Sequence, residues 1–304
     1  MEAIVVDDGS TDGSLQTVER LGAHSALNVI REEHRGISAT KNRGFEASKG
    51  NVVLFLDGDC ILEQGSLREL DRSFQGNVVD CVGGEVRATN SSNMIAQTVE
   101  LMQNEVDRKW PFGANVAYSR KALDKAGLFD EQMNAGEDAE LYLRITKLGF
   151  KSEINRRVVA RTKNPDDLPS FFRQRLIWGR GFKQLTERHP ETFTRKIRLC
   201  FFWIGVMFLS PLMVAVDLRL VWVAPLLLAY NIIRFTPGAI TLYRKTGDAA
   251  HCIFVPFLRF VNALAYFVGW IHWCLLERMG RAKRLRPFLP CVTVDASVSL
   301  DLPR

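Results

Sequence analysis

The sequence has few cysteines, and its six cysteines form no Cys-x-x-Cys pair. This spacing supports neither a zinc site nor a disulfide framework, so a reducing compartment suits the N-terminal part of the chain. The first residues, MEAIVVDD, lack both the basic segment and the long apolar run of a secretory signal. There is also no Gly-rich phosphate loop near the N-terminus, which argues against nucleotidyl transfer. The sequence shows no aromatic-basic pattern of an RNA-binding protein, so we expect no nucleic-acid partner.

Long apolar runs are absent before Arg195 and present after it. Hydrophobic residues make up 47% of the 304 residues and charged residues 24%, which is ordinary for a globular protein. The segment 199–216 contains no charged residue, and further apolar stretches cover 220–241 and 252–276. Eighteen helical residues span about 27 Å, close to the thickness of a bilayer core. We therefore predict a soluble domain followed by transmembrane helices at about these three segments.

Basic residues flank the apolar part of the chain on both sides. Arg195, Lys196 and Arg198 precede the first apolar segment, which predicts a multi-pass protein of the cell membrane whose soluble domain faces the cytoplasm. A second basic cluster occupies 278–286 and is expected to face anionic lipid, at about 1 kcal/mol per residue. Three full spans would place this second cluster on the opposite side of the membrane. The number of spans therefore stays open.

Short β-rich runs alternate with helical stretches over the first 160 residues, which predicts an α/β layered sheet. We expect strands at 3–6, 27–30, 52–56 and 151–160, and helices at 15–21, 38–48, 119–126 and 138–148. The predicted domains are a catalytic domain at 1–165, an amphipathic interfacial segment at 166–198, transmembrane helices at 199–277 and a basic tail at 278–304. The interfacial segment has aromatic residues at helical spacing with basic residues between them. An ordinary packing helix with solvated basic residues explains this pattern equally well.

Two acidic turns follow apolar strands, and they are the strongest chemical signal. The first is IVVDDGSTD at 4–12, and the second is VVLFLDGD at 52–59. Ligands of open α/β sheets bind at the carboxyl ends of strands. Asp57 and Asp59 can share a hard divalent cation and leave positions open for phosphate oxygens. Ordinary surface turns are the alternative, but carboxylates at the end of a buried strand are costly unless a cation or hydrogen bonds satisfy them.

These motifs carry a resemblance to a known family. DDGSTD, Gly36-x-x-Ala39-Thr40-Lys41-Asn42-x-Gly44 and FLDGD resemble the family 2 glycosyltransferases of GT-A fold. GAN at 113–115, GLFDE at 127–131 and GEDAEL at 136–141 continue the match in the same order. The resemblance covers about 1–185, and the apolar tail is similar to that of the processive and lipid-linked members.

The resemblance also implies a difference at the start of the chain. Family members have an additional strand and helix before the DDGS strand, and that strand lies beside the nucleotide. Its absence here would remove part of the donor pocket and expose a sheet edge. We therefore expect a GT-A-like sheet without its first strand, as in a fragment, a reading frame begun at an internal Met, or an impaired protein.

The resemblance implies roles for the donor side of the site. Asp7 and Asp8 would contact the nucleotide base, uracil being the expected one. Lys41 stands where the family usually has arginine and would lie near the base or the diphosphate. Asp57 would face the ribose and diphosphate, and Asp59 would bind Mg²⁺ or Mn²⁺. A divalent cation neutralises the charge that develops on a departing nucleoside diphosphate.

On the acceptor side, the resemblance makes Asp138 the general base, with Glu137 in support. The simpler alternative is that both residues cap the N-terminus of a helix, at about 0.3–1 kcal/mol each. The family signature Gln-x-x-Arg-Trp occurs here at 174–178 with Ile177 in place of the arginine. Gln174 and Trp178 can still line the acceptor or the donor sugar, although simple packing explains Trp178 equally well. The missing charge could come from a neighbouring arginine: Arg173, Arg175 or Arg180.

The predicted function is that of a membrane-anchored, metal-dependent inverting glycosyltransferase of the hexosyltransferase type. It would transfer a sugar from a nucleoside-diphosphate donor, UDP-sugar above all, to a hydroxyl of a lipid-linked or cell-surface glycan. Such a role belongs to cell-wall or polysaccharide biosynthesis, and the altered signature favours one or a few additions over processive synthesis. The alternative is a catalytically impaired paralogue that acts as a non-enzymatic membrane component of a glycan-synthesis complex. Metal-dependent nucleotide binding distinguishes the two.

Overall fold

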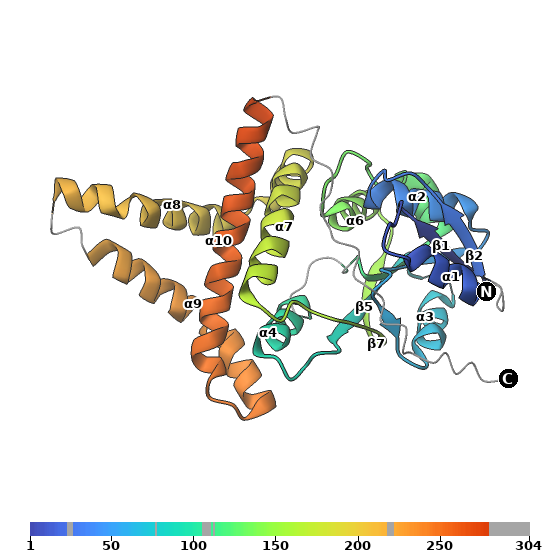
Figure 1. Cartoon of the computed structure of the whole chain (residues 1–304), viewed down its shortest axis with the longest axis horizontal. Coiled ribbons are helices and arrows are strands. Elements are labelled where there is room, and N and C mark those ends of the chain that lie inside the picture. The colour runs from blue at the N-terminus through green and yellow to red at the C-terminus, as the bar shows by residue number, and fades with distance from the viewer. Residues whose placement is uncertain (23–26, 77, 105–110, 112, 218–221, 280–304) are drawn as a thin grey trace.

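The computed structural model describes residues 1–22, 27–76, 78–104, 111, 113–217 and 222–279. An α/β half is followed by a helical half (Figure 1). The strands are β1 (Ala3–Asp7), β2 (Leu27–Arg31), β3 (Val52–Leu56), β4 (Ile61–Leu62), β5 (Cys81–Ala88), β6 (Asn115–Ser119) and β7 (Ser152–Thr162). The helices of the α/β half are α1 (Ser14–Gly22), α2 (Ile37–Ala47), α3 (Ser66–Phe74), α4 (Met94–Gln103), α5 (Arg120–Ala126) and α6 (Glu137–Lys147). Those of the helical half are α7 (Leu168–Arg188), η1 (Pro190–Thr192), α8 (Arg195–Val216), α9 (Val223–Thr246) and α10 (His251–Arg278).

The strands form two sheets. β1 and β2 pair in parallel, with Val5 opposite Val29. The larger sheet has five strands in the order β3-β6-β5-β7-β4, in which β5 and β7 are parallel and the other pairs antiparallel. β6 lies inside this sheet, and Ala117 at its centre pairs with Leu54 on one side and Val82 on the other. The strand that ends in the second acidic turn, β3, is thereby fixed at one edge of the larger sheet.

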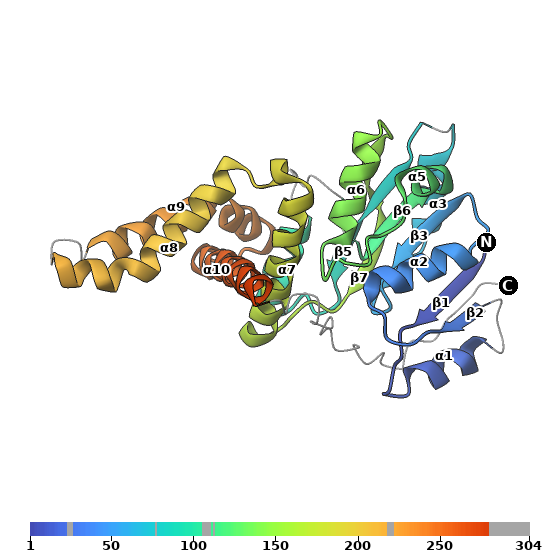
Figure 2. The ribbon, with the colours of Figure 1, turned by 90° about the horizontal axis from the view of Figure 1, so that it is seen from above.

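Helices cover both faces of the larger sheet (Figure 2). α2, α5 and α6 pack on one face around Phe55 and Tyr118, whose rings meet edge to face. α3 covers the other face, where Leu70 packs against Val82. Burying each large apolar side chain stabilises the fold by about 1.5–3 kcal/mol. The predicted α/β layered architecture is confirmed.

The helical half is attached to the α/β half through α4, α7 and α10. Val99 of α4, Phe171 of α7 and Leu258 of α10 form one buried cluster. α7 and α10 lie along each other, and they approach most closely where each has a glycine. A Cβ on Gly269 would lie 2.1 Å from the carbonyl oxygen of Leu176. This helix pair therefore requires a residue without a side chain at the contact.

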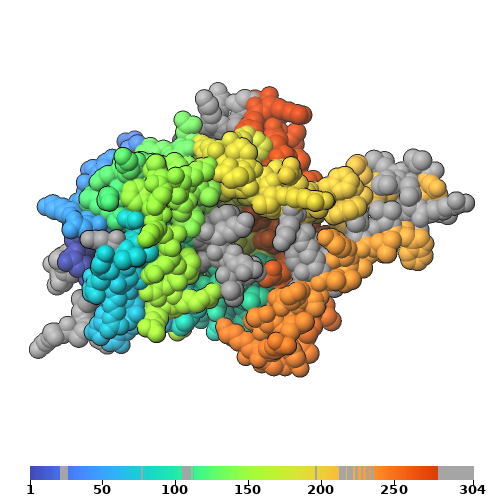
Figure 3. All heavy atoms as spheres, turned by 180° about the vertical axis from the view of Figure 1, so that it is seen from behind, coloured from blue at the N-terminus to red at the C-terminus, as the bar shows by residue number. Residues whose placement is uncertain are grey.

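The predicted transmembrane segments correspond to α8, α9 and α10. Within the described residues, α10 alone is long and apolar enough to cross a membrane, judged by length and composition, and 197–211 in α8 forms a shorter apolar stretch. α8 and α9 extend away from the rest of the molecule (Figures 1 and 3). The predicted crossing of the membrane stays a prediction. The basic tail lies outside the described residues from residue 280 onward.

The predicted strands and helices of the first 160 residues are present with shifted ends. The helix expected at 119–126 begins at Arg120, because the hydroxyl of Ser119 accepts a hydrogen bond from the amide of Ala122 and so caps the helix. The helix expected at 138–148 begins one residue earlier, at Glu137. The sequence analysis did not predict β4, α3, β5, α4 or β6.

Asn42 provides a test of how α2 is attached to the loop before α6. Its side-chain Nδ2 donates to the carbonyl of Phe129, and its Oδ1 accepts from the amide of Phe129, both at 2.9 Å. Asn42→Ala leaves buried backbone groups unpaired, so we expect the free energy of unfolding to fall by about 1–3 kcal/mol. Glu46→Ala, on the exposed face of the same helix, should change it by less than about 0.5 kcal/mol. Denaturant unfolding measures both, and equal effects would contradict this account.

Candidate active site

The turn after β3 places two carboxylates at the open edge of the sheet. Asp59 accepts a hydrogen bond of 3.0 Å from the hydroxyl of Thr162 on β7, and the side chain of Asp57 is 38% exposed. Among the described residues, apart from its two chain neighbours, nothing lies within 4 Å of where a Cβ on Gly58 would be, so the turn is open on this side. Burial raises the pKa of Asp57, and the opposing influence of Lys41 does not cancel this shift.

Lys41 of α2 lies between the end of β3 and the start of α6. Its ammonium is 2.8 Å from Oε1 of Glu137 and 4.0 Å from Oδ1 of Asp57, and its side chain is only 11% exposed. Burial alone would lower the pKa of Lys41, but the carboxylates of Glu137 and Asp57 raise it above its ordinary value. The ammonium also lies 5.3 Å from the centre of the Phe129 ring. It therefore stays charged and balances the surrounding carboxylates.

α6 begins at the expected acidic pair, and the two residues make different contacts. Glu137 is buried and pairs with Lys41. The carboxylate of Asp138 accepts hydrogen bonds from the amides of Gly113 at 2.7 Å and Ala139 at 2.8 Å. Burial, together with the charge of Glu137, raises the pKa of Asp138 to about 6. Asp138 thus interacts with the first turn of its helix, as the capping alternative expects, and also has the raised pKa that suits a general base.

Gly113 is required by this geometry. A Cβ at this position would lie 2.7 Å from Oδ2 of Asp138 and 2.9 Å from its Cβ. Only glycine lets the backbone amide approach the carboxylate so closely. The motif at 113–115 carries part of the family resemblance, but its pattern in the sequence indicates no role for the glycine. The structure shows that Gly113 holds Asp138 in place.

The first acidic turn makes contacts of its own. The carboxylate of Asp7 accepts from the amide of Ser10, and that of Asp8 accepts from the amides of Arg35 at 2.8 Å and Gly36 at 3.0 Å. Gly36 has φ +98°, which favours glycine, and directly precedes α2. Asp8 therefore orients the start of the helix that carries Lys41. Contact of Asp7 and Asp8 with a nucleotide base stays a prediction.

α7 carries the altered signature and presents a buried arginine. Arg175 is 3% exposed, and its guanidinium stacks 4.0 Å from the ring centre of Trp178 and 5.0 Å from that of Phe171. Among the described residues, its Nε and Nη2 have no hydrogen-bond partner, and neither has Oε1 of Gln174. Burial lowers the pKa of Arg175 to about 10. A buried cation with unpaired donors is suited to an anionic ligand.

α7 and α10 bring Arg175 to the side of the site where Asp138 lies. Gly181 of α7 packs against the backbone of Ala135, just before α6, where a Cβ would lie 2.2 Å from the carbonyl oxygen. The Arg175 guanidinium and the Asp138 carboxylate both interact electrostatically with the hydroxyl of Tyr266 on α10. The roles of Gln174 and Trp178 toward a sugar stay predictions.

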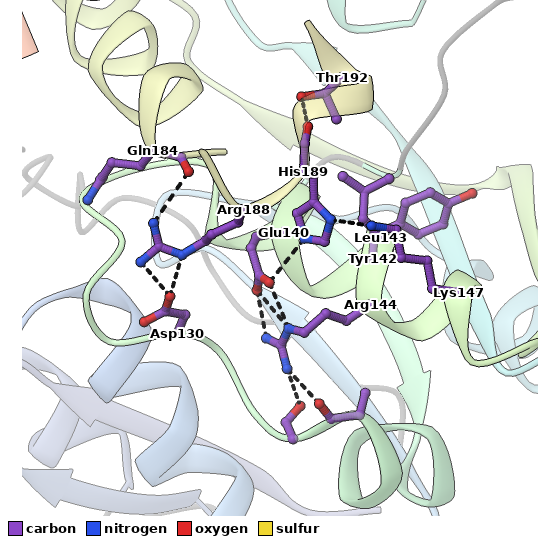
Figure 4. A network of polar contacts seen from close by, with 12 residues as sticks. Asp130, Glu140, Tyr142, Leu143, Arg144, Lys147, Gln184, Arg188, His189 and Thr192 are labelled. Carbon is purple, nitrogen blue, oxygen red and sulfur yellow. Dashed lines mark hydrogen bonds and ion pairs between the residues drawn. The ribbon is translucent and has the colours of Figure 1, made fainter. Parts of the chain in front are cut away.

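A polar network fixes α6 to the end of α7 (Figure 4). The buried carboxylate of Glu140 accepts hydrogen bonds from Arg144 at 2.7–2.9 Å and lies 3.3 Å from Nε2 of His189. Arg188 donates to Asp130 at 2.7 Å in the preceding loop. The sequence analysis did not identify these residues. The spacing of Glu140 and Arg144, four apart on an expected helix, was the available signal.

The donor set at the β3 turn suits Mg²⁺ or Mn²⁺ bound jointly with a ligand. Within the described part of the chain, no group of three or more His, Cys, Asp or Glu side chains could hold a metal. Asp57 and Asp59 offer carboxylate oxygens beside open space. Mg²⁺ is typically held by one or two carboxylates together with substrate phosphates and water. These residues fit that arrangement.

The chain is similar to known glycosyltransferases. Residues 1–132 match the sequence model described as glycosyl transferase family 2. Glycosyltransferase AglE of Haloferax volcanii is 28% identical over 158 residues, which cover 49% of this chain and 52% of that protein. The pre-mycofactocin glycosyltransferase of Mycobacterium tuberculosis is 26% identical over 206 residues, covering 63% of this chain and 43% of that protein. The chain thus spans about half the length of these curated relatives.

A solved structure shares the fold. The mannosyltransferase PcManGT of Pyrobaculum calidifontis, in complex with GDP-Man and Mn²⁺, aligns with a TM-score of 0.56 at 20% identity. The alignment covers 91% of this chain and 78% of that one, so it includes helices beyond the α/β half. At this identity the likeness shows a GT-A-like fold.

Lys41 offers a test of the charge balance in the site. Lys41→Met removes the ammonium and leaves the carboxylates of Glu137, Asp57 and Asp138 facing one another, so we expect the free energy of unfolding at neutral pH to fall by about 3–5 kcal/mol. Protonation of these carboxylates relieves their repulsion in the variant. The destabilisation should therefore shrink as the pH falls and the carboxylates take up protons. Unfolding curves at several pH values measure this, and a loss independent of pH would contradict it.

Proposed function

We propose that the chain is a metal-dependent, inverting glycosyltransferase acting at a membrane, on the basis of its site and of the match of residues 1–132 to the sequence model of glycosyl transferase family 2. The observation that supports this most directly is the meeting of Lys41, Asp57, Asp59, Glu137 and Asp138 at the ends of β3 and α6. One ammonium and several carboxylates beside an open edge are suited to a nucleoside diphosphate bound together with a divalent cation.

In the proposed reaction the acceptor hydroxyl attacks the anomeric carbon of the donor sugar. The carboxylate of Asp138 accepts the hydroxyl proton as the new C–O bond forms, and the bond from the anomeric carbon to the diphosphate oxygen breaks. Lys41 stabilises the negative charge that develops on the diphosphate. A bound Mg²⁺ or Mn²⁺, held by Asp59 with Asp57, would supply further neutralisation. Glu137 holds Lys41 in position.

We assign the substrate side to α7. Arg175 lies within the altered signature and is buried. We propose that its guanidinium supplies the positive charge that the signature arginine, replaced here by Ile177, would otherwise provide. Gln174 and Trp178 are proposed to line the sugar or the acceptor. A lipid-linked or cell-surface glycan suits an active site beside membrane-associated helices, with the catalytic domain facing the cytoplasm.

The donor is proposed to be a nucleoside-diphosphate sugar, with Asp7 and Asp8 near its base. UDP-sugars are the first candidates. The solved mannosyltransferase holds GDP-Man and Mn²⁺, so GDP-sugars belong in the same panel, and its bound ion supports a divalent cation here. A non-enzymatic membrane component, the alternative, would not need to bind a nucleotide.

Nucleotide binding by the full chain is the primary test. Calorimetric titration of UDP and GDP should show binding that depends on Mg²⁺ or Mn²⁺, and Asp59→Asn should weaken it at least tenfold because a cation ligand is lost. Asp124→Asn, on the exposed side of α5, is the matched control and should bind as the native chain does. Absence of binding to either nucleotide with either metal would support the non-enzymatic alternative.

The general base predicts a characteristic pH dependence. Below about pH 6 the raised pKa leaves Asp138 protonated and unable to accept a proton, so kcat/KM should fall about tenfold per pH unit there. Asp138→Asn should lower kcat by about 10²–10⁴-fold, retain nucleotide binding and remove this acidic limb. The rate of sugar transfer from a competent donor, measured from pH 5 upward (about one unit below that pKa), checks both effects. Unchanged turnover in Asp138→Asn would contradict the assignment of Asp138 as the general base.

A further inference from the structure

α8 and α9 present apolar side chains to the surroundings on a hairpin that projects from the molecule (Figures 1 and 3). Leu226 is 67% exposed and Ile233 72% exposed on α9, and Phe202, Phe208 and Leu209 of α8 are each more than half exposed. The sequence has no charged residue in 199–216 or in 220–233. An exposed apolar surface that continues over two helices marks contact with a partner or with lipid.

The hairpin and α10 point in different directions. In Figure 1 α10 stands beside α7 while α8 and α9 run crosswise to it, and in Figure 2 α10 is seen along its axis while α8 and α9 still extend sideways. The base of the hairpin is packed on α10. Phe201 of α8 contacts the rings of Phe267 and Trp270, and Leu242 of α9 packs on Val255. The hairpin and α10 therefore cannot both stand along the normal of one bilayer.

The contacts of α10 argue against its being the inserted element, despite its length and apolar composition. Nε2 of its buried His251 is 2.7 Å from Oε1 of Gln97 on α4, and Leu258 packs on Phe171 of α7. Insertion of α10 would draw these neighbours to the depth of the hydrocarbon. α7 would bring a set of cations that are costly at the bilayer centre: Arg173, Arg175, Arg180 and Lys183.

The base of the hairpin carries exposed basic residues. Arg195 and Arg198 are exposed at the start of α8, and Arg244 and Lys245 are exposed at the end of α9. Lys245 lies 3.5 Å from Glu100 of α4, so the end of α9 is beside the α/β half. Basic residues at both ends of an apolar hairpin are complementary to anionic headgroups on one face of a bilayer.

We propose that α8 and α9 insert into the hydrocarbon core as a hairpin that enters and leaves on one membrane face, while α10 lies along that face with α7 beside it. The occupant of the apolar surface is lipid, with anionic headgroups at the hairpin base. This arrangement concerns membrane contact alone and does not depend on the proposed sugar transfer.

Quenching of a fluorescent amino acid at single positions tests this arrangement. The full chain, added to preformed vesicles of phosphatidylcholine and phosphatidylglycerol, carries the probe at Leu209 or Ile233 of the hairpin, or at Ile253 or Ile271 of α10, all exposed. Lipids with brominated acyl chains should quench the hairpin probes, and iodide added outside should not. Iodide should reach both α10 probes, although they lie about 27 Å apart along the helix.

Three outcomes would overturn the proposal. Iodide that reaches only one of the two α10 probes would make α10 the spanning helix. Hairpin probes open to iodide would place the hairpin in water. Hairpin probes shielded from both quenchers in a dimeric protein would make a second copy the occupant.

A pair of variants tests the energetic side. Leu226→Lys places a charge in the uncharged part of α9, eight residues before Arg234, and should weaken partition into the same vesicles about a hundredfold. Leu148→Lys alters a residue that is 50% exposed on the α/β half and should leave partition unchanged within about threefold. Both variants should bind nucleotide in detergent as the native chain does, so failure of the membrane arrangement is distinguishable from failure of the proposed function. Equal partition of the two variants would overturn the proposal.

Discussion

The ion pair between Lys41 and Glu137 is the constraint on which the candidate site depends. It joins α2 to the start of α6 at 2.8 Å, and Asp57 at the end of β3 lies 4.0 Å from the same ammonium. One ammonium does not balance the carboxylates of Asp57, Asp59, Glu137 and Asp138, so the site remains acidic. An acidic site repels a bare diphosphate and favours a diphosphate accompanied by a cation. This charge imbalance is the physical reason to expect a divalent metal here.

α6 connects the donor side of the site with the helical half. Its first turn holds Asp138 against the amide of Gly113 and also contributes Glu140 to the network with Arg144 and His189. Because α7 also contacts the loop before α6 at Gly181, the position of Asp138 and that of Arg175 are set by the same packing. A displacement of α7 would therefore also displace Asp138, the proposed general base. The helical half thus helps to position the residues of the site.

Strands and helices whose apolar pattern agrees with their burial in the fold were predicted from the sequence. Those whose residues are determined by contacts with distant parts of the chain were not. β3 is an unbroken apolar run followed by Asp57, and both were found. β5 was not predicted, because Gly83 and Gly84 lie within it and glycine is unfavourable in strands. Glycine is needed there because a Cβ would lie 2.5 Å from Pro111 and 2.1 Å from the side chain of Asn115. The Lys41–Glu137 pair joins residues 96 apart in the chain, and no spacing rule reveals such a contact.

Hydropathy and burial give different answers about the membrane, and burial is the more informative for α10. Length and composition select α10 among the described helices, yet part of its apolar surface packs against α4 and α7, as Leu258 and Val261 show. In the arms of the hairpin, by contrast, Leu226 is 67% exposed and Ile233 is 72% exposed. A helix whose apolar side chains are already buried in protein gains little from lipid, whereas an exposed one gains the full transfer free energy. If lipid covers the hairpin, α7 and the proposed acceptor side lie next to the headgroups, where a lipid-linked hydroxyl would be presented.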